Sequence, residues 1–150
     1  MLNLSKKILV AIDGSPQSDK AAEEAIRLAS AAGSRFKSKV YAMLVLPGMR
    51  TPSFTDFFPA PPLTEQPDWE EKRQRIFFVV EKAAKEAGLT LENRVVYGDA
   101  TEEILGFAEE EEISVIVIGS SGAGRVRRAL LGSVSAKVAM HARCSVYIVR

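Results

Sequence analysis

The sequence predicts an α/β fold in which helices cover a parallel sheet. Along the 150 residues, short apolar runs alternate with longer segments whose apolar residues recur at the period of a helix, as in parallel βα units. One apolar run, residues 115–118, leads directly into a glycine-rich segment that begins at Gly119. Glycines after a buried strand let the backbone approach a ligand closely, which is typical of the binding edge of such a sheet.

Length and charge are those of one globular domain, which we expect to span residues 1–150. A chain of this length buries roughly two thirds of the surface that its unfolded form exposes, so it needs no metal or disulfide for stability. The net charge of +1 argues against a general affinity for nucleic acid. Cys144 is the single cysteine, which excludes an internal disulfide and a cysteine-based metal cluster.

The N-terminal residues favour a cytoplasmic location without a membrane partner. Residues 1–7 lack the apolar core of a signal peptide, and the apolar run 8–12 is far shorter than a membrane-spanning helix. A single cysteine also suits a reducing compartment. We therefore expect a cytoplasmic protein.

The first third of the chain predicts a strand, a helix and a second strand. The strands are expected at about 7–12 and 39–46. Ser15 and Pro16 supply an N-cap and a first-turn proline for a helix that ends near Gly33. Small residues recur along one face of this helix, which predicts close packing on the sheet: Ser18, Ala22, Ala25, Ala29 and Ala32.

Residues 47–67 predict a long loop, because they contain six of the seven prolines and cannot form a regular helix or a central strand. A second helix is expected to open with a capping box of Asp68 and Glu71 and to end at Gly88. The remaining elements continue the alternation, with strands expected at 91–97, 114–118 and 145–149 and helices at 101–111 and 133–141.

The spacing Gly119, Gly122 and Gly132-Ser133 predicts a phosphate site. Two glycines follow the strand. Beyond them, the N-terminus of the helix expected at 133–141 offers unpaired N–H groups and a partial positive charge to an anion. Taken singly, these residues also fit an ordinary strand-to-helix loop and an ordinary N-cap. The combined spacing favours the phosphate site.

Gly-x2-Gly-x9-Gly-Ser, followed by Val134-Ser135, resembles the nucleotide-binding signature of the universal stress protein family. The resemblance extends from Lys6–Ser15 to Cys144–Val149. It implies a three-layer fold of the adenine nucleotide alpha hydrolase-like type: an open parallel five-stranded sheet in the order 3-2-1-4-5, with helices on both faces. In such sheets the ligand lies beyond the carboxyl ends of the strands, where the strand order reverses.

The resemblance also implies the residues of a site for an adenine nucleotide, ATP or AMP. Adenine and ribose are expected to contact Ala11, Ile12, Asp13 and Val45. The ribose and α-phosphate are expected to pack on Ile118, Gly119, Ser120 and Gly122, and outer phosphates on Gly132, Ser133, Val134 and Ser135. Asp13 can accept from ribose hydroxyls or help hold Mg²⁺, or it can simply cap the turn that follows it, and the spacing leaves these roles equal.

The glycine segment departs from other phosphate-binding motifs. It is a near miss to a Walker A loop, with Arg125 and Val126 where the lysine and the Ser/Thr metal ligand belong, and it lacks the glycine order of a dinucleotide fingerprint. Ser121 and Ala123 stand where many universal stress proteins carry a histidine and a basic residue. Arg125 and Arg127 could contact phosphates instead, or form a solvated basic surface.

The expected function is therefore that of a cytoplasmic stress-response module that binds an adenine nucleotide and is not an enzyme. One alternative is slow ATP hydrolysis, with a metal at Asp13 and Ser133 at the transferred group, although no water-activating base is evident. Another is a nucleotide-independent interaction module that uses residues 47–67. The terminal strand 145–149 is an edge in the implied topology, and a homodimer formed through it is expected.

Overall fold

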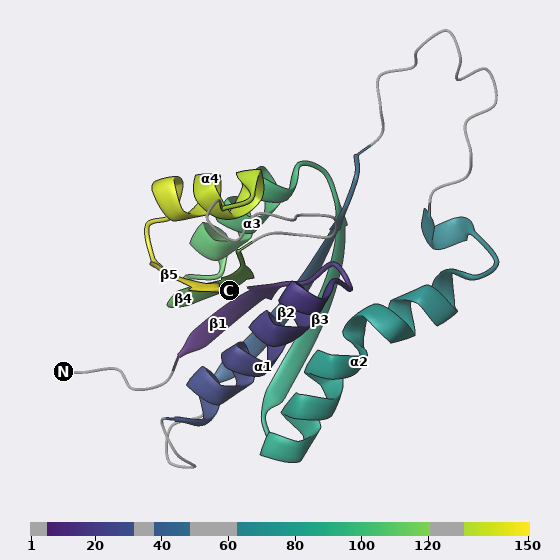
Figure 1. Ribbon diagram of the computed structural model, residues 1–150, viewed down its shortest axis with the longest axis horizontal. Coiled ribbons are helices and arrows are strands. Elements are labelled where there is room, and N and C mark those ends of the chain that lie inside the picture. The colour runs from purple at the N-terminus through teal and green to yellow at the C-terminus, as the bar shows by residue number, and fades with distance from the viewer. Residues whose placement is uncertain (1–5, 32–37, 49–62, 121–130) are drawn as a thin grey trace, which may run out of the picture.

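The computed structural model describes residues 6–31, 38–48, 63–120 and 131–150, and it confirms the predicted fold class (Figure 1). A parallel sheet has the order β3-β2-β1-β4-β5. Its strands are β1 (Lys7–Ala11), β2 (Lys39–Leu46), β3 (Thr90–Tyr97), β4 (Val115–Gly119) and β5 (Ser145–Val149). The described helices are α1 (Pro16–Ser30), α2 (Trp69–Ala87), α3 (Ala100–Glu110) and α4 (Ser133–His141), with a short 3-10 helix, η1 (Leu63–Glu65).

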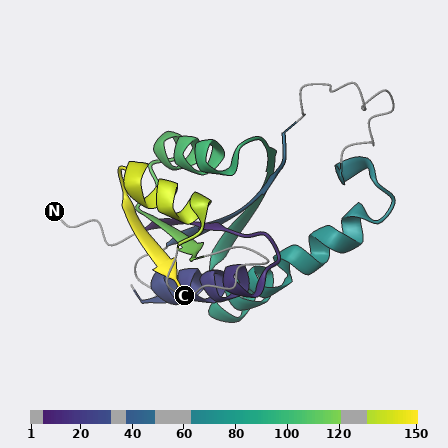
Figure 2. The ribbon, with the colours of Figure 1, turned by 45° about the horizontal axis from the view of Figure 1, so that its top comes forward.

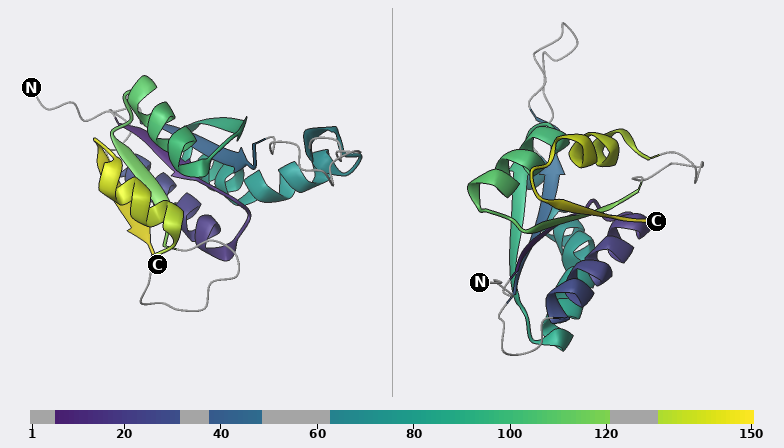
Figure 3. Two further views of the ribbon diagram at one scale, coloured as in Figure 1. Left: turned by 90° about the horizontal axis from the view of Figure 1, so that it is seen from above. Right: turned by 90° about the vertical axis from the view of Figure 1, so that its left-hand side faces the viewer.

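Two hydrophobic cores lie on the two faces of the sheet, and the strand residues alternate between them. Ile8 and Val10 of β1 pack beneath α1 and α2, whereas Leu9 packs beneath α3 and α4. All three side chains are fully buried. Figure 2 and the two views of Figure 3 show the resulting three layers, with one pair of helices on each side of the sheet.

Helix α1 begins as the sequence predicts. Ser15 is the N-cap, its hydroxyl accepts from the Ser18 N–H at 3.2 Å, and Pro16 is the first helical residue. The small-residue stripe packs against the sheet, with Ser18, Ala22, Ala25 and Ala29 all buried. Ala32 and Gly33 lie outside the described residues.

The capping box predicted for α2 is wrong. Asp68 is the N-cap residue, but its side chain accepts no hydrogen bond from the first turn. Its carboxylate instead lies 3.0 Å from the ammonium of Lys72, one turn along, and the hydrogen bond with Lys72 lowers the pKa of Asp68. The predicted end is confirmed: Gly88 is left-handed, and its N–H donates to the last carbonyls.

Helix boundaries elsewhere lie close to those expected. α3 begins at Ala100, one residue earlier than predicted, because the Asp99 side chain caps it by accepting from the Glu102 N–H at 3.0 Å. α4 covers the predicted residues 133–141. No helix among the described residues is both long and apolar enough to cross a membrane.

Phe77 and its neighbour Phe78 on α2 provide a matched test of the core beneath α1 and α2. Phe77 is completely buried, whereas Phe78 is 60% exposed. We expect Phe77→Ala to lower the free energy of unfolding by about 3–5 kcal/mol, because it removes buried apolar contacts and leaves a cavity. Phe78→Ala is expected to change it by less than about 0.5 kcal/mol. Urea denaturation measures both, and equal losses would contradict this packing.

Candidate functional site

A cavity of about 290 Å³ lies at the carboxyl ends of the strands, where the strand order reverses around β1. Its walls come from the ends of β1, β2 and β4 and from the first turns of α1, α3 and α4. The residues that line it are Ala11, Ile12, Asp13, Ser15, Ser18, Met43, Val45, Ala100, Ile104, Ile118, Gly119, Gly132, Ser133, Val134 and Ser135. Parallel strands present their carboxyl ends at one edge, which brings these distant segments together.

Hydrogen bonds hold the turn between β1 and α1. The Asp13 carboxylate accepts from the Ser15 N–H at 2.8 Å, so Asp13 caps the turn, as one of its predicted roles requires. The Ser18 hydroxyl accepts from the Asp13 N–H at 3.3 Å and donates to the Ser15 carbonyl at 3.0 Å. Gly14 has a φ of 84°, and a Cβ there would lie 3.2 Å from Cγ1 of Ile76 on α2. The turn is therefore fixed from both sides.

Gly119 is required by packing within the protein. A Cβ at this position would lie 3.1 Å from Cβ of Gln17 and 3.2 Å from its carbonyl carbon and oxygen. Gln17 belongs to the first turn of α1. The bare backbone of Gly119 therefore lets α1 begin directly against the end of β4, a reason for glycine that the sequence analysis did not identify.

The N-terminus of α4 opens on the cavity without a side-chain cap. The N-cap is Gly132, not Ser133, and glycine has no side chain to accept from the first turn. The N–H groups of Ser133, Val134 and Ser135 therefore have no acceptor among the described residues, although all three residues line the cavity. The Ser135 hydroxyl donates to the carbonyls of Ser120 and Gly132, at 2.9 and 3.0 Å, which fixes the start of the helix.

The main-chain N–H and C=O of Val45 face the β1 side of β2, but at a level beyond the last residue of β1. The Met43 carbonyl accepts from the Ile12 N–H at 2.9 Å, so the peptide groups of Met43 face β1. Peptide groups alternate in direction along a strand, so those of Val45 face the same side. β1 ends at Ala11, and no described residue bonds to the Val45 N–H or C=O on that side. One donor and one acceptor remain at the cavity wall.

The structure brings most of the predicted site residues together. Ser120 lies beside the cavity: its N–H donates to the Val149 carbonyl at 2.7 Å, and its carbonyl accepts from the Gly132 N–H at 2.6 Å. Gly122, Arg125 and Arg127 lie outside the described residues. Those that line the cavity are Ala11, Ile12, Asp13, Val45, Ile118, Gly119, Gly132, Ser133, Val134 and Ser135.

Several lining residues were missed: Ser15, Ser18, Met43, Ala100 and Ile104. Met43 stands two residues before Val45, so strand alternation could have placed it on the same face. Ala100 and Ile104 are four residues apart in α3 and share one helix face. Only the packing of α3 over β2 brings that face to the cavity.

The electrostatic character of the described wall is mildly acidic. Asp13 is the charged side chain among its lining residues, and it is exposed. Asp19, in the first turns of α1, has its pKa raised by burial and then by the carboxylates of Glu23 and Asp13. Among the described residues no three His, Cys, Asp or Glu side chains gather in a way that could hold a metal ion.

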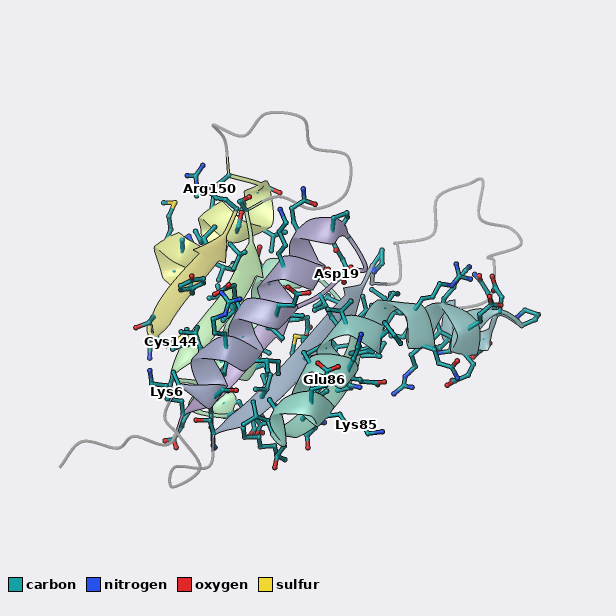
Figure 4. The ribbon with its side chains drawn as sticks, turned by 60° about the horizontal axis from the view of Figure 1, so that its bottom comes forward. Lys6, Asp19, Lys85, Glu86, Cys144 and Arg150 are labelled. Carbon is teal, nitrogen blue, oxygen red and sulfur yellow. The ribbon has the colours of Figure 1, made fainter. Side chains whose placement is uncertain are left out.

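Cys144 lies far from this end of the molecule. Figure 4 shows Cys144 and Lys6 at one end, with Asp19 and Arg150 toward the other. The cysteine is half-buried and packs against the core beneath α3 and α4, and burial raises the pKa of its thiol. Both facts favour a packed side chain over a reactive thiolate.

Gly119→Ala tests the close approach of α1 to β4. We expect it to lower the free energy of unfolding by roughly 1–3 kcal/mol, because the added methyl meets the Gln17 backbone. The control is Gly106→Ala in α3, where a Cβ would meet nothing within 4 Å. That change is expected to raise stability by roughly 0.5–1 kcal/mol through helix propensity. Urea denaturation of both variants measures these changes in the free energy of unfolding. A stabilising effect of Gly119→Ala would refute the contact with Gln17.

Comparison with known proteins agrees with this fold and with the signature. The sequence profile of the Universal stress protein family matches residues 5–150. Universal stress protein MJ0531 of Methanocaldococcus jannaschii is 34% identical over 155 residues, which cover 99% of this chain and 84% of that protein.

Solved structures share the fold. A universal stress protein in complex with cAMP has a TM-score of 0.68 at 24% identity, covering 97% of each chain. A universal stress protein family protein from Arabidopsis thaliana with AMP bound has a TM-score of 0.64 at 21% identity, covering 96% of this chain and 90% of the other. With its profile matched from residue 5 to the last residue, this chain belongs to the universal stress protein family.

Proposed function

We propose that the cavity binds an adenine nucleotide, AMP or ATP, and that the protein acts as a cytoplasmic nucleotide-binding regulatory module and not as an enzyme. The observation that carries the proposal is that one cavity holds two sets of main-chain groups without a partner among the described residues, at Val45 and at the first turn of α4. Buried main-chain groups are normally paired, so groups left open at a cavity point to a polar ligand.

Val45 suits the edge of adenine. Its N–H can donate to ring nitrogen N1, and its C=O can accept from the 6-amino group, which gives two hydrogen bonds to one base edge. The side chains around it, Met43, Ala100, Ile104 and Ile118, are apolar and can pack on the base. A mostly apolar wall with a few polar groups is typical of a small-molecule site.

The first turn of α4 suits a phosphate group. Three uncapped N–H groups and the positive end of the helix dipole face the cavity beside Gly119 and Gly132. β2 and β4 are separated by β1, so the base and phosphate regions lie about two strand spacings, roughly 10 Å, apart. That separation fits a nucleotide. If Mg²⁺ accompanied a triphosphate, the Asp13 carboxylate at the cavity wall would be a ligand for it.

Family members support the same ligand class, since the structures compared above contain cAMP and AMP. Their likeness to this chain is one of fold, so the ligand of this protein rests on the cavity itself. The proposed role is that nucleotide occupancy of this cavity regulates the protein.

Ser133→Pro tests the phosphate region without disturbing the helix. Ser133 is the first residue of α4, where proline is well tolerated, and Gly132 before it is extended. The variant removes one N–H donor, and a charge-assisted hydrogen bond contributes roughly 1.5–3 kcal/mol, so AMP affinity is expected to fall about tenfold or more. Calorimetric titration of nucleotide-free protein with AMP, ATP and adenosine measures it.

Two comparisons make this experiment decisive. Ser133→Ala separates the share of the hydroxyl from that of the N–H group, and adenosine, which lacks phosphate, should bind both proline variant and wild type alike. Wild-type protein that binds none of the three ligands would overturn the proposed function. An equal loss for adenosine and AMP would place the phosphate elsewhere.

We further propose a homodimer formed by pairing of β5 with its symmetry mate. β5 is a sheet edge, and it carries Tyr147, which is 41% exposed. The Val149 carbonyl accepts from the Ser120 N–H at the β4 side, so by alternation the peptide groups of Val146 and Ile148 face outward. These outward groups are a template for a second strand.

Val146→Pro removes an outward N–H while sparing the ladder to β4. We expect wild type to sediment as a dimer at micromolar concentration and this variant to shift toward monomer. The thermal unfolding of the variant, followed by circular dichroism, shows whether the subunit itself remains folded. Monomeric wild type, or a variant dimer of unchanged affinity, would count against pairing through β5.

A further inference from the structure

We propose that Ala100, at the first turn of α3, is a specificity-determining residue that restricts the cavity to adenine with an unsubstituted 6-amino group. This inference rests on the proposed function, because it takes the base to lie against Val45. It concerns a wall of the cavity that the nucleotide-binding signature does not include.

The first turn of α3 lies beside the proposed base edge. The N–H of Gly98, two residues before Ala100, donates to the carbonyl of Leu46 at 2.9 Å, directly after Val45 on β2. The C=O of Val45 follows its N–H in chain direction, toward Leu46. A 6-amino group bonded to that C=O therefore lies toward the Leu46 end of β2, the end at which α3 begins, and Ala100 lines the same cavity as Val45.

Hydrogen bonds hold the corner before α3. Asp99 caps the helix by accepting from the Glu102 N–H at 3.0 Å, and its own carbonyl accepts from the Glu103 N–H at 2.9 Å. Gly98 has a φ of 153°, and a Cβ there would lie 2.6 Å from a carboxylate oxygen of Glu103. The Asp99 cap and the hydrogen bond from Gly98 to Leu46 therefore hold this wall in place beside the cavity.

Ala100 is the side chain of this wall that can be changed without disturbing the core. Ile104, one turn along, and Met43 are both 1% exposed and belong to the buried cluster beneath α3 and α4. Ala100 is only half-buried and lines the cavity. Its methyl group therefore fixes how much space remains beside the base edge, while Ile104 and Met43 form the floor.

The test is a pair of affinities measured on each protein, for AMP and for N6-methyl-AMP, by calorimetric titration. Wild type is expected to prefer AMP, since one methyl group in an apolar pocket changes discrimination by roughly 10- to 200-fold. Ala100→Gly removes the methyl of the wall and is expected to lower the AMP preference by about tenfold. Ala100→Val is expected to weaken AMP itself by about tenfold.

The ratio of two affinities on one protein does not depend on the fraction that is folded, so Ala100→Gly remains informative even if the variant is less stable. Ala87→Val, at the exposed C-terminal residue of α2, is the matched control and should leave the ratio unchanged. Wild type that fails to bind AMP would overturn the proposed function and this inference with it. If wild type binds AMP but Ala100→Gly alters the ratio of the two affinities by less than about threefold, this inference alone is overturned.

Discussion

The position of β1 between β2 and β4 is the constraint on which the cavity depends. The helix that follows β1 leaves on one face of the sheet, and the helix that follows β4 leaves on the other. β1 ends at Ala11 while β2 continues to Leu46, so the last peptide groups of β2 lose their neighbour. Close packing of α1 on Gly119 keeps this arrangement compact. The opening is thus a consequence of strand order and strand length.

The helices differ in whether a side chain caps their N-terminus. Ser15 caps α1 and Asp99 caps α3, each accepting from the first turn of its helix. α4 has no side-chain cap, and it is the helix whose first turn contributes four consecutive residues to the cavity, Gly132 to Ser135. A capped terminus satisfies its N–H groups within the protein, whereas an uncapped one leaves them for a ligand. α2 also lacks a side-chain cap hydrogen bond at Asp68, but its residues do not line this cavity, so the uncapped first turn at the cavity is that of α4.

The proposed base region and the proposed phosphate region have different origins. The phosphate region comes from a local motif, a glycine and a serine at the start of one helix, and sequence spacing predicts it. The base region comes from three strands and α3, which meet only after folding. Ala100 and Ile104 were missed for this reason, since only the packing of α3 over β2 brings their helix face to the cavity. Gly119, which was predicted to contact a nucleotide, lines the cavity, and its contact with Gln17 gives it a role in packing as well.

By itself the sequence determined the fold class, the element order and the Ser15 and Gly88 caps. These follow from apolar periodicity and from residues whose backbone preferences act within one turn. Tertiary structure decided which partner each polar group takes. Asp68 pairs with Lys72 and does not cap α2, and Asp13 accepts from the Ser15 N–H. Val45 lies beyond the last residue of β1, so its main-chain groups have no β1 residue to pair with. A side chain or peptide group with several possible partners takes the one that packing brings within hydrogen-bonding distance, and only the folded chain sets that distance.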